Sequence, residues 1–254
     1  MSYQEFFATL EKTLSTENRF VKENRFVKIS EREDKSDLPL SAWNQLISYS
    51  YHQTWKGIIL GKGLTEIGMY PMLLNELKPK TVIEIGALRG ASAVWIADNL
   101  EIFGVESTIY SMDIDLSLLD ARAASDSRIN FIEGDSNHIS TIFSPEKLLS
   151  LPHPWLIIED AHVNLTGVLD YFHQNGLQAE DYLIIEDTNL FMWEYWAEHW
   201  KDKQLIEEQR YKLLELRHWL KAYEDEYLVD TYYQDIYGYN VSKNWNSILK
   251  KVST

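Results

Sequence analysis

The pentapeptide Leu-Ile-Ile-Glu-Asp occurs twice in the chain, as Leu156–Asp160 and as Leu183–Asp187. Each copy is a short, uninterrupted apolar run, which is typical of a strand buried on both faces, and each ends in two carboxylates. The stretch between the copies, residues 163–176, has apolar side chains at helical spacing and can cross from one strand to the next. The repeat therefore predicts a strand, a helix and a second, parallel strand.

The four carboxylates that end these strands are predicted to converge. Parallel strands end at the same edge of a sheet, where open α/β sheets bind their ligands. The side chains expected to meet there are Glu159, Asp160, Glu186 and Asp187. Two like charges about 4 Å apart cost about 4 kcal/mol at an effective dielectric constant of about 20, so protonation, a basic partner or a cation must offset them. A hard divalent cation such as Mg²⁺ takes oxygen ligands and leaves positions open for a substrate oxygen, and we expect such an ion here.

Strands and helices alternate over most of the chain. Short apolar runs predict five further strands, at Thr81–Ile85, Ser107–Met112, Asn130–Ile132, Tyr227–Gln234 and Ser247–Val252. Helical patterns at Ser92–Leu100 and Ser117–Ala124 lie between the first three of them. The alternation predicts an α/β fold, built on a doubly wound and mostly parallel sheet of seven strands.

Helical appendages are expected around this sheet. Residues 1–54 are predicted to form an N-terminal helical arm or cap, and residues 55–254 the main domain. Within the arm, a helical pattern at Tyr3–Leu14 precedes the sequence Glu-Asn-Arg-Phe-Val-Lys, which occurs at Glu17–Lys22 and again at Glu23–Lys28 and which we interpret as a tolerated insertion. Near the C-terminus, residues 190–227 include a Trp-rich amphipathic stretch, Trp193–Tyr227, which predicts one or two long helices. These helices could form a substrate lid, or they could pack against the sheet or a second subunit.

Composition limits the possible function classes. The 254 residues carry a formal charge of −15, which argues against a nucleic-acid or anionic-membrane partner, because either needs a basic face. The chain has no cysteine, which excludes disulfides, zinc–thiolate sites and cysteine nucleophiles. Met1 leads into a polar, acidic segment without a visible signal peptide or membrane span, so we expect a cytoplasmic protein.

The turn after the strand Thr81–Ile85 has the composition of a ligand-binding loop. Glu84 lies at the strand end and could bind a cation or an amine, while Gly86 and Gly90 allow a tight turn and close approach of a ligand. The helix that follows, with Ser92 in its first turn, presents free amide groups. Leu88 stands where the dinucleotide fingerprint needs its middle glycine, which disfavours a pyrophosphate site.

The next two predicted strands also end in polar residues. Asp113 ends the first of them and offers a carboxylate that could accept hydrogen bonds from both hydroxyls of a ribose. Asp135 and Ser136 follow the second and could meet the amino group of an adenine. The strand ends therefore predict a nucleoside site beside the carboxylate cluster.

In this order along the chain, the residues resemble a known family. The matching positions are the run Glu84–Val94 together with Asp113, Asp135, Ser136, Asp160, Glu186 and Asp187. The pattern is similar to class I S-adenosylmethionine (SAM)-dependent O-methyltransferases of the metal-dependent type. Within that group it most resembles the cephalosporin hydroxylase-like family, which also includes sugar O-methyltransferases. The resemblance extends from residue 55 to the C-terminus and implies a Rossmann-like class I methyltransferase fold.

The resemblance implies a role for each matching residue. Those that would surround SAM are Glu84, Gly86, Gly90, Ser92, Asp113, Asp135 and Ser136. Those that would ligate Mg²⁺ are Asp160, Glu186 and Asp187. Among the first group, Glu84 would lie near the amino group of the methionine portion, Asp113 would hold the ribose, and Asp135 would meet the adenine.

One departure from the wider group concerns the catalytic base. Catechol-type relatives carry a lysine base shortly after the first metal aspartate, and Val163 stands at the corresponding position here. His162, two residues beyond Asp160, could accept the proton of the substrate hydroxyl at neutral pH. It could equally be a loop histidine that only hydrogen-bonds to the backbone.

The resemblance implies Mg²⁺-dependent transfer of a methyl group from SAM to a hydroxyl of a small molecule, a sugar or another secondary metabolite. Aromatic residues that could wall the acceptor pocket are Tyr70, Trp193 and Trp196. Two alternatives are a hydroxylase and a non-catalytic subunit that binds SAM. The predicted ligands are three carboxylates and not the two histidines and one carboxylate of non-haem iron oxygenases, so nothing in the sequence supports the hydroxylase directly. The amphipathic arm and the Trp-rich helices favour a homo-oligomer.

Overall fold

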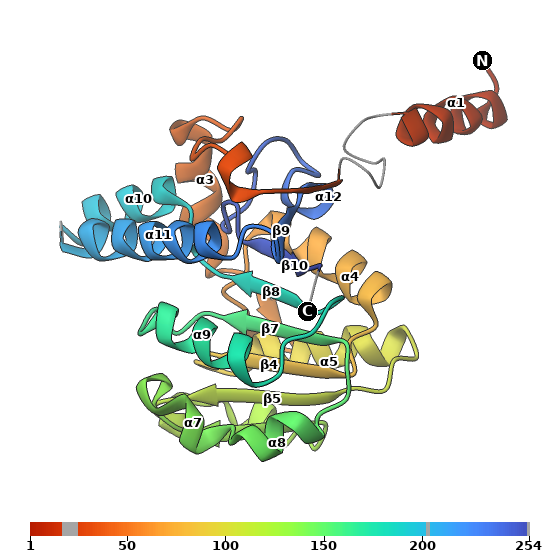
Figure 1. Ribbon diagram of the computed structural model, residues 1–254. Helices are drawn as coiled ribbons and strands as arrows, with labels where there is room; N and C mark the ends of the chain where they lie inside the picture. The colour runs from red at the N-terminus through yellow and green to blue at the C-terminus, as the bar shows by residue number, and fades with distance from the viewer. Residues whose placement is uncertain (17–24, 202–203, 253–254) are drawn as a thin grey trace.

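The computed structural model describes residues 1–16, 25–201 and 204–252, and it is organised around one eight-stranded sheet (Figure 1). The strand order is β1-β9-β10-β8-β7-β4-β5-β6. Five neighbouring strands are parallel: β4 (Thr81–Ile85), β5 (Thr108–Asp113), β6 (Ile129–Glu133), β7 (Trp155–Glu159) and β8 (Tyr182–Ile185). Three antiparallel strands complete one edge: β10 (Ile248–Lys251), β9 (Tyr227–Asp230) and β1 (Phe26–Val27). The predicted α/β class and the mostly parallel sheet are confirmed.

Two details of the predicted sheet are wrong. The sheet has eight strands and not seven, because Phe26–Val27 pairs with β9 and adds an edge strand that the sequence pattern did not reveal. The strand expected over Tyr227–Gln234 ends at Asp230. The Asp230 carboxylate accepts a hydrogen bond from the backbone N–H of Tyr232 and so caps a short helix, α12 (Thr231–Gln234).

The two copies of the pentapeptide are offset by one residue where they pair. Ile157 lies opposite Leu183, and Glu159 lies opposite Ile185. Side chains alternate between the faces of a strand, so this offset places Asp160 beside Glu186, on the opposite face from Glu159. The strand ends therefore send carboxylates to both faces of the sheet.

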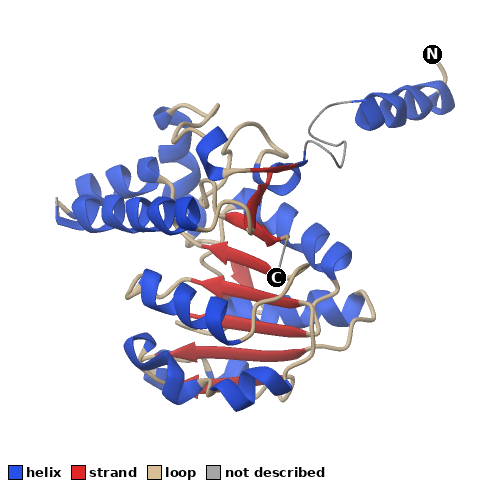
Figure 2. Ribbon diagram, in the orientation of Figure 1, coloured by secondary structure: helices blue, strands red, loops and turns tan. Residues whose placement is uncertain are grey.

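Helices cover both faces of the sheet (Figures 1 and 2). On one face, α9 (Leu165–Asn175) and α11 (Gln204–Ala222) pack over apolar side chains of β7 and β8, together with the short helices α7 (Ile139–Ile142) and α8 (Pro145–Ser150). On the other, α4 (Leu64–Leu77) and α5 (Ala91–Ile102) cover a second core, beside α6 (Ala121–Ala124). The hairpin of β2 (Thr54–Trp55) and β3 (Ile58–Ile59) lies just before α4 in the chain.

Only the first part of the expected N-terminal arm projects from the domain, and the second part packs against it. Helix α1 (Tyr3–Thr16) projects from the body of the molecule in Figure 1, with the side chains of Phe6, Phe7 and Leu10 exposed. The residues of the tandem repeat up to position 24 lie outside the described residues. Residues 25–50 instead pack on the domain through β1, a short turn at Ile29–Glu31 and α3 (Leu40–Ser50).

The Trp-rich segment forms two helices, as predicted. They are α10 (Leu190–Trp200) and α11. Trp43 and Ile47 of α3 join Met192 and Trp193 of α10 in a separate apolar cluster, which ties the N-terminal residues to the C-terminal half. No helix within the described ranges combines the length and the apolar character needed to cross a membrane.

A buried ion pair fastens the N-terminal residues to the domain. The Arg32 guanidinium donates two hydrogen bonds to the Asp235 carboxylate, at 2.7 and 2.8 Å, and a third to Asn246 at 2.8 Å. Its side chain is only 5% exposed. Both partners lie more than 200 positions further along the chain.

We expect Arg32→Ala to lower the free energy of unfolding by about 3 to 5 kcal/mol, because the buried Asp235 carboxylate loses its cation. The matched control is Lys35→Ala, which removes an exposed charge from the same segment and should cost less than about 1 kcal/mol. Urea unfolding followed by tryptophan fluorescence measures both. Equal, small effects would mean that this ion pair does not hold the segment on the domain.

Candidate cofactor and metal site

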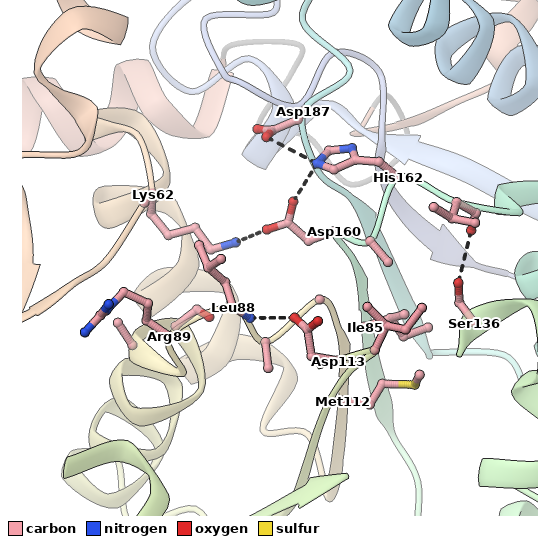
Figure 3. Close-up of a pocket in the computed structure, with 18 of the residues that line it drawn as sticks. Lys62, Ile85, Leu88, Arg89, Met112, Asp113, Ser136, Asp160, His162 and Asp187 are labelled. Carbon is pink, nitrogen blue, oxygen red and sulfur yellow. Dashed lines mark hydrogen bonds and ion pairs between the residues drawn. The ribbon is translucent and has the colours of Figure 1, made fainter. Parts of the chain in front are cut away.

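One cavity of about 470 Å³ lies at the carboxyl ends of the parallel strands (Figure 3). It is lined by most of the residues predicted from the sequence: Gly86, Ser92, Asp113, Asp135, Ser136, Asp160, His162 and Asp187. Three predicted residues, Glu84, Gly90 and Glu186, are not among those that line it. The strand ends thus bring the nucleoside and metal candidates to a single cavity.

The loop after β4 and the end of β5 form one wall. The backbone N–H of Leu88 donates a 2.7 Å hydrogen bond to one carboxylate oxygen of Asp113, and the other oxygen accepts one from Asp115 at 3.3 Å. Leu88 adopts a left-handed backbone conformation, with φ of 46°. The Asp113 carboxylate is therefore fixed against the loop at the wall of the cavity (Figure 3).

The two glycines of this loop act differently. Gly86 has φ of +105°, and a Cβ there would lie 2.7 Å from the backbone carbonyl of Asp160, so only glycine lets the loop touch the end of β7. Gly90 has φ of +77°, and a Cβ there would lie 2.7 Å from the side chains of Leu119 and Ala123. Gly86 therefore shapes the cavity, whereas Gly90 allows close packing behind it.

Glu84 lies behind the cavity wall. Its side chain is almost completely buried, and one oxygen accepts a 2.5 Å hydrogen bond from the Ser111 hydroxyl. Burial raises the pKa of this carboxyl above its usual range, which the nearby Lys62 opposes. The structure thus separates Glu84 from the residues that face the cavity.

The end of β6 supplies the adenine candidates. The Asp135 carboxylate accepts hydrogen bonds from the backbone and the side chain of Asn137, at 2.8 and 2.9 Å. The Ser136 hydroxyl donates to the Val163 carbonyl at 3.4 Å. Both residues line the same cavity as Asp113.

At the other end of the cavity, Lys62 stands between two of the strand-end carboxylates. Its ammonium lies 3.3 Å from Asp160 and 3.0 Å from Glu186, and its side chain is 3% exposed. The Tyr70 hydroxyl also donates to Glu186, and both side chains are fully buried. Against the effect of burial, Lys62 lowers the pKa of Glu186 below its ordinary value.

Two further lysines pair with the remaining carboxylates. Lys243, in the loop before β10, lies 2.8 Å from Asp187. Lys212, on α11, lies 2.9 Å from Glu159. Of the three ways to offset the charges that the sequence left open, the structure shows basic partners, which are three buried lysines from three distant segments. None of the three was predicted, although Gly61-Lys62-Gly63 places one cation in an otherwise apolar stretch.

Three potential metal ligands meet between these lysines. Asp160, His162 and Asp187 each offer a ligand atom, and these atoms lie within 4.8 Å of one another. Burial, reinforced by Asp187 and Glu186, raises the pKa of Asp160 to about 7. Glu186, the third ligand predicted from the sequence, lies next to Asp160 but points to Tyr70 and Lys62.

His162 occupies the centre of this group. Its Nε2 lies 3.5 Å from Asp160 and 3.8 Å from Asp187, while its Nδ1 lies 3.0 Å from the ammonium of Lys212 (Figure 3 shows the first two contacts). Burial and then the Lys212 charge lower the pKa of His162 to about 4. The imidazole is therefore neutral at pH 7.

The aromatic residues expected around an acceptor lie behind the cavity. Tyr70 is buried below Glu186, Trp193 meets the His162 ring edge to face at 5.6 Å, and Trp196 packs against Tyr51 at 5.7 Å. None of the three lines the cavity, whereas Tyr51 does. A second, more open cavity of about 390 Å³ lies between His162 and α11.

Comparison with known proteins places these features in a family. The profile of the family described as Rhamnosyl O-methyltransferase/CmcI matches residues 47–244. Rhamnosyl O-methyltransferase of Mycobacterium leprae (strain TN) is 35% identical over 141 residues, which are 54% of this chain and 61% of that protein. The protein of the same name from Mycobacterium tuberculosis (strain ATCC 25618 / H37Rv) is 29% identical over 140 residues, 54% of this chain and 57% of that protein. The matched region thus spans little more than half of these curated relatives.

Solved structures of CmcI share the fold. The apo-structure of CmcI superposes with a TM-score of 0.62 at 26% identity and covers 88% of each chain. A CmcI structure with Mg and SAM has a TM-score of 0.61 at 27% identity, over 90% of this chain and 91% of that one. The family match over residues 47–244 shows that this chain belongs to the Rhamnosyl O-methyltransferase/CmcI family, as the resemblance in its motifs predicted.

Proposed function

We propose that the protein transfers a methyl group from SAM to a hydroxyl of a small molecule, with Mg²⁺ bound beside the acceptor. The observation that carries this proposal is that one cavity joins Asp113 and Asp135, at its nucleoside end, to Asp160 and Asp187, at its acidic end. A CmcI structure contains Mg and SAM, and that protein is similar to this one over most of both chains.

The nucleoside end of the cavity fits SAM. Asp113 offers acceptors for the ribose hydroxyls, and Asp135 with Ser136 offers an acceptor and a hydroxyl for the adenine. Gly86 and Ser92 line the stretch toward the acidic end, where the methionine portion would lie. SAM, when bound, supplies a methyl group on a sulfonium. The protein would hold SAM so that this methyl group faces the acceptor oxygen, and such positioning supplies much of the rate acceleration.

The acidic end fits a divalent cation. Asp160 and Asp187 provide oxygen ligands, and Glu186 lies next to Asp160 with one buried carboxylate oxygen that has no hydrogen-bond partner among the described residues. We propose these three carboxylates as the ligands. Mg²⁺, when bound, supplies positive charge that orients the acceptor hydroxyl and lowers its pKa.

The acceptor is proposed to enter beside this acidic end. Tyr51, Ile59 and Leu60, from the residues before α4, line the cavity near Lys243. An apolar wall next to charged groups suits a molecule with hydroxyls on one side and apolar carbons on the other. The names of the curated relatives point to a rhamnosyl group as one acceptor of this class. Self-association and a cytoplasmic location stay predictions.

Two alternatives have less support. A hydroxylase of the non-haem iron type needs two histidines and one carboxylate, and the only ligand group found among the described residues has one histidine. A non-catalytic SAM-binding subunit would not need the acidic end of the cavity.

His162 is the predicted acceptor of the substrate proton. Whether it can act as one depends on which of its two ring nitrogens carries the lone pair.

We expect Asp113→Ala to weaken the binding of S-adenosylhomocysteine at least tenfold, because two ribose hydroxyls lose a charged acceptor worth about 1.5 to 3 kcal/mol. Asp115→Ala, which removes a similar charge from the same strand end outside the cavity wall, is the matched control and should bind normally. Calorimetric titration measures both. Unchanged affinity in Asp113→Ala would remove the ribose from this position.

Asp160→Asn should abolish most methyl transfer while S-adenosylhomocysteine affinity changes less than about threefold, because the substitution keeps the shape and removes a charged metal ligand. Screening with labelled SAM and rhamnosyl or other hydroxylated acceptors measures turnover. The exposed Asp225→Asn controls for loss of one charge. Normal turnover in Asp160→Asn would contradict a metal-assisted reaction.

Mg²⁺ affinity should rise with pH and level off above about pH 7, because the raised pKa of Asp160 lets protons compete with the ion below that value. Well below pH 7 the affinity should fall about tenfold per pH unit, as expected when one proton is released on binding. Calorimetry from about pH 5.5 to pH 8 tests this dependence. A flat profile would show that Asp160 is already ionised over the whole range.

A further inference from the structure

The side chain of Lys212, on α11, reaches both the carboxylate cluster and His162. Its ammonium lies 2.9 Å from the Glu159 carboxylate, 2.9 Å from the Glu186 backbone carbonyl and 3.0 Å from Nδ1 of His162. The side chain is 5% exposed, so water does not replace these partners. Three acceptor atoms thus surround the amine.

The charge of Lys212 decides which way these hydrogen bonds run. The ammonium of Lys212 forms a 2.9 Å ion pair with the buried Glu159 carboxylate. An ammonium has three N–H donors and no lone pair. All three donors have a partner here, so the nitrogen of His162 that faces Lys212 must be the acceptor.

The direction of the hydrogen bond between Lys212 and Nδ1 of His162 determines the tautomer of the imidazole. A neutral imidazole has one N–H and one lone pair, and the lone pair is on Nδ1, where Lys212 donates. The proton is then on Nε2, which faces Asp160 and Asp187 at 3.5 and 3.8 Å. We propose that Lys212 is a positioning residue that holds His162 as the Nε2–H tautomer, so that an N–H and not a lone pair faces the two carboxylates.

Other contacts keep the ring in this orientation. The backbone N–H of His162 donates to Glu159 at 3.1 Å, so the carboxylate that pairs with Lys212 also holds the histidine backbone. Trp193 packs against the ring at 5.6 Å, and its indole N–H donates to the Asp187 carbonyl at 2.6 Å. The backbone of His162 has φ of 58°, a conformation that such local contacts must stabilise.

This arrangement changes the role of His162 in the proposed reaction. With Nδ1 bound to Lys212 and a proton on Nε2, neither nitrogen has a free lone pair for a substrate proton or a metal ion. The Nε2–H instead faces Asp160 and Asp187, where it adds positive electrostatic potential beside the two proposed metal ligands. This role rests on the proposed function, whereas the tautomer itself does not.

The decisive experiment is long-range ¹H–¹⁵N NMR on the wild-type protein without metal or SAM, at pH 7. His162→Gln identifies the His162 signals among the seven histidines by their absence. We expect one protonated nitrogen, Nε2, and an unprotonated, hydrogen-bonded Nδ1. A protonated Nδ1, or a mixture of both tautomers, would overturn the proposal. The wild-type spectrum decides the matter without any variant having to be active.

Lys212→Met tests the cause. It should shift the Nδ1 resonance of His162, because that nitrogen loses its donor. The matched control is Lys221→Met, which removes an exposed lysine from the same helix and should leave the resonance in place. An unshifted Nδ1 signal in folded Lys212→Met would show that Lys212 does not set the tautomer.

Titration of the same wild-type sample with S-adenosylhomocysteine separates this inference from the proposed function. The expected spectrum together with binding supports both. The expected spectrum without binding supports the tautomer and argues against the methyltransferase proposal. The opposite tautomer together with binding overturns only the role of Lys212.

Discussion

The pairing of four strand-end carboxylates with three buried lysines is the interaction on which the site depends. Parallel strands β7 and β8 end side by side, and the resulting acidic edge would be unstable without cations. The ammonium groups of Lys62, Lys212 and Lys243 supply three positive charges against four negative ones. The one charge left over favours a further cation at this edge, which agrees with the donors that Asp160 and Asp187 present to the cavity.

The sequence was sufficient to predict the parallel part of the sheet and the place of the site, but not the edge strand β1. Short apolar runs such as the one that begins Leu156–Asp160 are typical of buried strands, and parallel strands end at the same edge of a sheet. The same logic brought Asp113 and Asp135 to the cavity. The one-residue offset between β7 and β8 could not be predicted, because register depends on packing against α9 and α4 and not on the repeat itself.

The lysines and the tautomer of His162 could not be predicted for a different reason. Lys62 pairs with Glu186, more than 120 positions away, and no local pattern relates the two. Electrostatics required some cation, yet it could not select Lys62 from 24 basic residues. Similarly, a histidine two positions after an aspartate is compatible with a base, a ligand or a donor. Only the contact with Lys212 on α11 distinguishes among them.

The wide separation of the three lysines along the chain has a consequence for biogenesis. During synthesis, β7 and β8 emerge from the ribosome before Lys212 and Lys243 do, so their carboxylates at first lack two of their three cations. A nascent chain can therefore collapse its central strands early but cannot complete the acidic edge until Lys212 and Lys243 have emerged. The acidic edge therefore acquires its full set of lysine partners, and with it the geometry of the site, only late in folding.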